Sequence, residues 1–130
     1  MITDEANPDD WYMLAAERLR AADMIFAAAG SSFSAVELLQ ESVERYLKGY
    51  LISQGWQLIR THNLNDLIAA AIPIDARFSS FDYLAENLTD QFFLQHYPGG
   101  DMTDVGSDFV ELRRLTDDLI QLIAPPSRTP

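Results

Sequence analysis

Residues 40–48 read Gln-Glu-Ser-Val-Glu-Arg-Tyr-Leu-Lys and residues 61–64 read Thr-His-Asn-Leu, and these two segments decide how the chain is interpreted. In the first segment Glu44 and Lys48 stand one helical turn apart, beside an apolar stripe. In the second segment His62 stands in a short turn that leads into another helix. If the two segments pack together, a carboxylate, an ammonium group and an imidazole meet at one end of a bundle. They would form either a polar site or a structural lock.

Apolar residues repeat at helical spacing along the whole chain, which predicts an all-α protein. Long helices are expected over about residues 9–29, 34–53, 78–95 and 103–123, and a short helix from about residue 63 is expected to end at Pro73. No segment shows the sustained alternation of a strand. We therefore expect an antiparallel up-down bundle of four long helices plus one short helix.

The aromatic residues also follow helical spacing, so we expect them in the core and not as stacking platforms for a ligand. In the fourth long helix the residues expected to face inward are Phe81, Leu84, Leu88, Phe92 and Phe93. In the last helix the inward stripe is expected to begin at Val105.

Length and composition indicate one soluble domain spanning residues 1–130, with its core at about residues 9–123. The chain has no cysteine, and its acidic start and lack of a long apolar stretch favour a cytoplasmic protein without a membrane span. The net charge of −11 makes nonspecific DNA binding unfavourable, because such binding depends on cations that neutralise phosphates. An acidic surface can instead steer a basic protein partner, and a small basic pocket could still hold a nucleotide.

The second helix carries two acid–base pairs in the favourable order, Glu41 with Arg45 and Glu44 with Lys48. On a solvated face each pair would contribute only about 0.3–0.5 kcal/mol. In the alternative interpretation, Arg45 or Lys48 contacts a phosphate or carboxylate of a ligand. Gln40 lies one turn before Glu44, so a polar row runs beside the apolar stripe, where a helix–helix or subunit interface could lie.

Two loops carry the remaining candidates. Thr61 or Asn63 can cap the short helix, and His62 between them is either structural or a general base. Residues 96–101 form either a plain helix-ending loop or one end of a pocket shaped by His96, Tyr97 and Asp101. The spacing of the histidines and Asp101 matches no metal motif, so neither a metal nor a cofactor is expected.

Three segments of the chain resemble motifs of the HEPN domain family, in the right order over about residues 9–123. Residues 40–48 resemble the family's second-helix signature, commonly Q-Q-A-x-E-K-x-L-K. Gly55 followed by residues 61–64 resembles its Gly and T-H-D-L stretch, and Tyr97-Pro98 resembles the R-Y-P loop before its last helix. The resemblance implies a helical bundle that is usually a homodimer. It also implies pairing with a small nucleotidyltransferase, commonly in a toxin–antitoxin or similar two-gene arrangement.

Some HEPN proteins are metal-independent ribonucleases, and others are proposed nucleotide-binding or substrate-binding subunits. The ribonucleases carry an arginine followed four to six residues later by a histidine, and no arginine of this chain stands in that relation to a histidine. Arg60 is two residues before His62, and the nearest arginine before His96 is Arg77. The chain also has His96 where the family has an arginine before Tyr-Pro, which removes a permanent positive charge.

The sequence therefore favours a HEPN-like accessory or binding protein over an enzyme. It is expected to be dimeric and to bind a nucleotide or pair with a nucleotidyltransferase. The alternative is a metal-independent ribonuclease with a degenerate site, in which His62 is the base. No residue is predicted to be catalytic under the leading hypothesis. The candidate ligand-binding residues are Gln40, Glu44, Arg45, Lys48, His62, His96, Tyr97 and Asp101.

Overall fold

The computed structural model describes residues 1–126, which form helices and turns with no β-strand in that range. The helices are α1 (Pro8–Ala29), α2 (Phe33–Ser53), α3 (Leu64–Ala71), the short 3₁₀ helix η1 (Ala76–Phe81), α4 (Asp82–His96) and α5 (Phe109–Ile123). The expected all-α class is confirmed. Residues 127–130 of the predicted domain lie outside the described residues. No helix within residues 1–126 is both long enough and apolar enough to cross a membrane.

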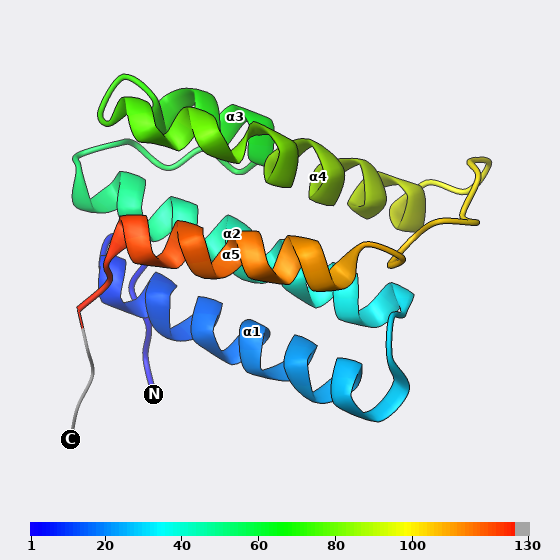
Figure 1. The fold of residues 1–130 in the computed structure, drawn as a ribbon. Helices are drawn as coiled ribbons and strands as arrows, with labels where there is room; N and C mark the ends of the chain where they lie inside the picture. The colour runs from blue at the N-terminus through cyan, green and yellow to red at the C-terminus, as the bar shows by residue number, and fades with distance from the viewer. Residues whose placement is uncertain (127–130) are drawn as a thin grey trace.

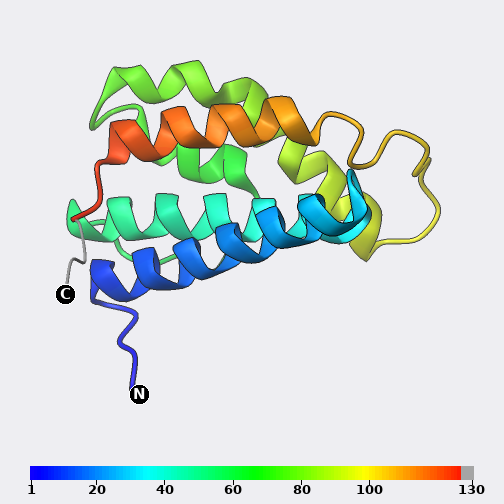
Figure 2. The same cartoon turned by 60° about the horizontal axis from the view of Figure 1, so that its bottom comes forward.

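The helix α2 is the central element of the fold, since it packs against α1, α3, α4 and α5. Figures 1 and 2 show α1 and α2 side by side, with the chain turning back between them. Gly30 supports this turn with a positive φ of 72°, and the Ser32 hydroxyl begins α2 by accepting a hydrogen bond from the Ala35 amide at 3.1 Å. Because of this central position, more than half of the residues of α2 are buried.

Small residues allow α1 and α2 to approach closely. Ala15 and Ala22 are the fully buried residues of α1, and the Ser42 hydroxyl donates to the Ala15 carbonyl at 2.8 Å. A side chain at Gly49 would place its Cβ 2.7 Å from the Tyr12 ring, a distance that no stable packing tolerates. Most of the larger apolar residues of α1 are half-buried, and Met24 is exposed, because this helix covers only one side of α2.

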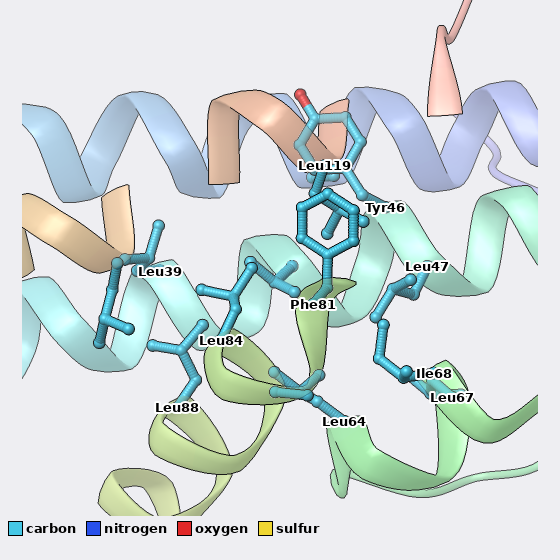
Figure 3. Close-up of a cluster of buried hydrophobic side chains, with 14 of the residues drawn as sticks. Leu39, Tyr46, Leu47, Leu64, Leu67, Ile68, Phe81, Leu84, Leu88 and Leu119 are labelled. Atoms are coloured by element: carbon cyan, nitrogen blue, oxygen red, sulfur yellow. The ribbon is translucent and has the colours of Figure 1, made fainter. Parts of the chain in front are cut away.

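The apolar core lies between α2 and the elements that follow it (Figure 3). Every long helix contributes side chains with almost no exposed surface. Those drawn in Figure 3 include Leu39, Leu47, Leu64, Leu67, Leu84, Leu88 and Leu119. Burying each such side chain contributes roughly 1.5–3 kcal/mol, so this core is the main stabilising term of the fold.

The fourth long helix begins differently from the prediction. Its expected first turn is the separate 3₁₀ helix η1, and α4 starts at Asp82. Asp75 caps η1 by accepting a hydrogen bond from the Arg77 amide at 3.0 Å. In a 3₁₀ helix residues three apart share a face, so Phe78 and Phe81 both reach the core, at 0% and 7% exposure.

The last helix begins at Phe109, not near Thr103 as predicted. Residues 103–108 form turns instead, in which Gly106 has a positive φ of 85° and donates to the Gln91 side chain at 2.7 Å. A Cβ at Gly106 would lie 2.9 Å from the Ser32 carbonyl oxygen, so this turn packs directly on the start of α2. Val105 is buried as expected, but it belongs to this turn.

Two contacts tie the start of α5 to the end of α1. The rings of Phe26 and Phe109 stack with centroids 4.7 Å apart. The Arg113 guanidinium binds Asp23 at 2.8 Å and Asp117 at 2.6 Å. These carboxylates, Asp23 above all, raise the pKa of Arg113 and fix it as a permanent cation.

Candidate functional site

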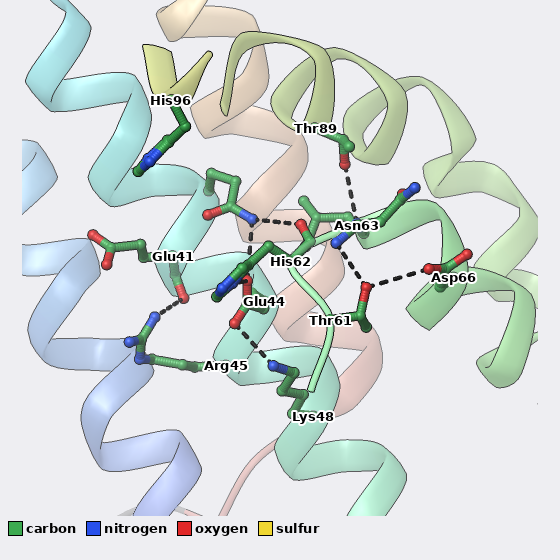
Figure 4. Close-up of polar contacts among 12 residues, drawn as sticks. Glu41, Glu44, Arg45, Lys48, Thr61, His62, Asn63, Asp66, Thr89 and His96 are labelled. Atoms are coloured by element: carbon green, nitrogen blue, oxygen red, sulfur yellow. Dashed lines mark hydrogen bonds and ion pairs between the residues drawn. The ribbon is translucent and has the colours of Figure 1, made fainter. Parts of the chain in front are cut away.

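The carboxylate of Glu44 is buried on α2, with 4% of the residue exposed, and three side chains satisfy it (Figure 4). Lys48 donates to Oε2 at 3.0 Å, and the Gln40 amide donates to Oε1 at 3.2 Å. The Nδ1 atom of His62 lies 3.0 Å from the same Oε1. The Gln40 amide also donates to the His62 backbone carbonyl at 3.0 Å, so Gln40 and Glu44 each join α2 to the His62 turn.

The ammonium group of Lys48 is as buried as its partner, since the residue is 5% exposed. Its Nζ lies 5.7 Å from the centre of the Trp11 ring, which adds a cation–π contact from α1. The interpretation of Glu44 and Lys48 as a solvated pair is therefore wrong. The pair is an internal lock of the bundle.

A short hydrogen-bond chain holds the turn that carries His62. The Thr61 hydroxyl accepts from the Asn63 amide at 3.1 Å, and the Asn63 side chain caps α3. The Leu64 amide donates to the Thr89 hydroxyl at 3.0 Å, which fastens the start of α3 to α4. His62 thus has a fixed backbone, although its side chain is 65% exposed.

Because a carboxylate only accepts hydrogen bonds, the Glu44 contact places a proton on Nδ1 of His62. In the neutral imidazole the Nε2 atom is then an acceptor. This arrangement orients the ring in the way that a carboxylate orients a catalytic histidine, but it serves equally to anchor a turn.

Beside this network lies a pocket of about 270 Å³ between α2, the His62 turn and the end of α4. The Phe92 ring sits between the two histidines, with ring centres 5.2 Å from His62 and 4.1 Å from His96. The rings of Phe93 and Tyr97 stack at 5.9 Å. The pocket is lined by Glu37, Glu41, Glu44, Arg45, His62, Phe92, Phe93, His96 and Tyr97.

The polar side chains of the pocket differ in how well they are satisfied. A ring nitrogen of His96 bonds one oxygen of Glu37. Arg45 donates to the backbone carbonyl of Glu41 at 3.0 Å, and not to its carboxylate as the spacing predicted. Within residues 1–126 the Glu41 carboxylate has no hydrogen-bond or ion-pair partner.

The structure brings five of the eight sequence candidates into this pocket, namely Glu44, Arg45, His62, His96 and Tyr97. Gln40 and Lys48 do not line it and instead hold Glu44 in place. Asp101 lies elsewhere, because it binds the backbone and hydroxyl of Thr103 in the following loop. The hydroxyl first, and then the amide, hold the pKa of Asp101 below its usual value, so this carboxylate stays ionised as a loop cap.

Four lining residues were not among the candidates: Glu37, Glu41, Phe92 and Phe93. Glu37 was detectable, since it precedes Glu41 by one turn on the same face of α2. The expectation that all aromatics are core residues was wrong for Phe93, which is 38% exposed, and for Tyr97, which is 68% exposed. Among residues 1–126 no three His, Asp or Glu side chains are grouped as a metal site requires.

The fold and the site together define a class of protein, an all-α domain whose central helix carries a buried acid–base pair against a Thr-His-Asn turn. The model of the HEPN domain matches residues 9–123 of this chain. The chain therefore belongs to the HEPN domain family. Comparisons with curated proteins and with solved structures give no match.

Replacing Lys48 by methionine should lower the free energy of unfolding by roughly 3–5 kcal/mol, because it leaves the buried Glu44 carboxylate without its cation. Denaturant unfolding followed by circular dichroism measures this loss. Adding Glu44→Gln to Lys48→Met should recover part of the stability, since no buried charge remains. The control is Arg45→Met on the same helix, which should change stability by less than about 1 kcal/mol. Equal losses in Lys48→Met and Arg45→Met would contradict the internal lock.

Proposed function

We propose that this HEPN-domain protein is a cytoplasmic accessory subunit that acts by binding and not by chemistry. It would be a homodimer of antiparallel up-down bundles, each with four long helices and one short helix. Its partner would be a small nucleotidyltransferase, in a two-gene module of the toxin–antitoxin kind. One observation carries the binding role: an exposed aromatic pair stands at the rim of a charged pocket.

The aromatic pair is formed by Phe93 and Tyr97, at the end of α4. Both side chains remain exposed, at 38% and 68%, although their rings stack against each other at 5.9 Å. Exposing such rings to water is unfavourable, and aromatic residues are enriched where protein interfaces form. A partner that covers the pair would bury apolar area next to polar groups that fix its orientation.

The state of the polar groups also favours binding over catalysis. The Glu44 carboxylate is fully engaged by the chain's own donors, which suits a structural role. The arginine–histidine spacing of the ribonuclease members is absent from the sequence. These two observations support an accessory protein.

The charges that line the pocket disfavour a nucleotide, the ligand that the sequence led us to expect. Three carboxylates line it, from Glu37, Glu41 and Glu44, against the single guanidinium of Arg45. Phosphates would be repelled by the carboxylates, and Lys48 is buried behind Glu44. We therefore place the protein partner before the nucleotide.

Affinity capture from native lysate tests this function. The tagged chain should enrich a nucleotidyltransferase, and light scattering of the purified chain should give twice its mass of 14.6 kDa. Replacing Phe93 and Tyr97 together by serine should abolish the capture, because it removes the exposed rings. Tyr83→Ser is the matched control, since Tyr83 is another exposed aromatic residue of α4, at 54% exposure. A monomeric chain that enriches no nucleotidyltransferase would contradict the proposal.

A ribonuclease with a degenerate site is the second candidate, and one observation favours it. Glu44 orients His62 so that its Nε2 atom is the acceptor, which is the state a general base requires. Arg45 and His96 line the same pocket, so a cation and a second imidazole accompany this histidine without the usual sequence motif.

Incubation with structured and unstructured RNA separates the two candidates. We expect no cleavage by the wild-type protein or by His62→Ala, because the carboxylates of the pocket oppose RNA phosphates. Glu86→Gln, on the exposed side of α4, controls for contaminating nuclease. Cleavage by the wild type and by Glu86→Gln that is lost in His62→Ala would overturn our preference.

A further inference from the structure

Hydrogen-bond acceptors outnumber donors in the pocket. The Glu41 carboxylate is unpaired within the described chain, and Glu37 uses only one of its oxygens, on His96. Because the Glu44 contact places the His62 proton on Nδ1, the Nε2 atom of the neutral ring is one more acceptor. The donors available in the lining are the Arg45 guanidinium and the Tyr97 hydroxyl, against four acceptor oxygens or nitrogens on Glu37, Glu41 and His62. A ligand that completes this pocket must supply hydrogen-bond donors.

Gln40 does not line the pocket, but it is a second residue of the same helix edge with an acceptor that lacks a donor. The residue is 1% exposed, and its side-chain oxygen Oε1 is buried without a hydrogen-bond partner among residues 1–126. Rotating the amide would not help, because its nitrogen is already bound to Glu44 and to the His62 carbonyl. A buried acceptor of this kind carries a desolvation penalty until a donor reaches it.

The charges of the pocket favour a cationic ligand, which is consistent with the unpaired acceptors. Glu37 and Glu41 are four residues apart on α2, where like charges repel each other. Arg45 is one turn from Glu41 but donates to its backbone carbonyl, which leaves the carboxylate open. A cation between Glu37 and Glu41 would relieve the repulsion, and the net charge of −11 would draw it in.

Size and wall chemistry narrow the ligand class further. A pocket of about 270 Å³ is at or below the lower end of small-molecule sites, but it suits one side chain. The exposed rings of Phe93 and Tyr97 in its lining can contact a flat cation, whereas the Phe92 ring is already stacked on His96. A guanidinium group is flat, carries five N–H donors and binds carboxylates side-on.

We propose that this pocket receives the guanidinium group of an arginine side chain presented by a protein partner. Glu41 and Glu37 accept its N–H groups, and the exposed rings of Phe93 and Tyr97 contact its plane. The proposal rests on the proposed function, because it takes a protein partner as given and names the group by which that partner is recognised. Arg45 is the competitor within the chain, since its guanidinium can turn towards Glu41.

The test is a titration of the full-length protein with N-acetyl-arginine amide, followed by NMR of the His62 and Tyr97 side chains. The neutral isostere N-acetyl-citrulline amide and ATP are titrated in parallel. We expect saturable shifts with the arginine probe at millimolar concentration and none with the other two. Glu41→Gln should weaken binding about tenfold, because one charge-assisted contact is lost. Arg45→Met should strengthen it, and Glu86→Gln on the far part of α4 should change nothing.

The signs of these variants separate the possible ligands. An anionic ligand predicts the opposite pattern, with weaker binding in Arg45→Met and stronger binding in Glu41→Gln. Absence of saturable shifts with the arginine probe, equal shifts with the citrulline probe, or saturable binding of ATP at the same residues would overturn the guanidinium pocket. The titration needs no partner protein. Its failure would therefore contradict the guanidinium pocket alone, and the capture experiment would still test the proposed function. Probe binding without any captured nucleotidyltransferase supports the pocket and contradicts the proposed function.

Discussion

The buried carboxylate of Glu44 is the constraint on which the rest of the site depends. A carboxylate taken out of water destabilises the fold by several kcal/mol unless it is paired and hydrogen-bonded. Lys48 and Gln40 satisfy it from its own helix, and His62 satisfies it from the turn before α3. The Glu44 carboxylate therefore joins α2 to the turn that carries His62. It also fixes which nitrogen of His62 faces the pocket.

The position of α2 explains why this lock shapes a site. Because α2 contacts every other α-helix, the residues on its polar edge lie between the His62 turn and the end of α4. The buried residues of this edge, Gln40, Glu44 and Lys48, use their polar groups in hydrogen bonds within the bundle. The outer residues, Glu37, Glu41 and Arg45, line the pocket. The two sets form parallel rows along one helix edge, and Glu44 belongs to the buried row while also reaching the pocket.

Sequence reasoning succeeded where the physics is local and failed where it depends on neighbours. The order of Glu44 and Lys48, four residues apart, predicted their contact, and the spacing of apolar residues predicted the all-α class. Nothing local showed that the pair is buried, since its surroundings include Trp11 of α1 beside Lys48 and His62 beside Glu44. The prediction that Asp101 lines the pocket was wrong, because its carboxylate accepts a hydrogen bond from Thr103 within its own loop. The late start of α5 arises from Gly106 packing on Ser32, a contact between distant segments.

The most direct test of this account is the tautomer of His62, read from long-range ¹H–¹⁵N NMR spectra under conditions where the imidazole is neutral. The account predicts the proton on Nδ1, held by Glu44, and a mixture of tautomers when Glu44 is replaced by glutamine. A proton on Nε2 in the wild-type protein would contradict it, because His62 could then not donate to the buried carboxylate.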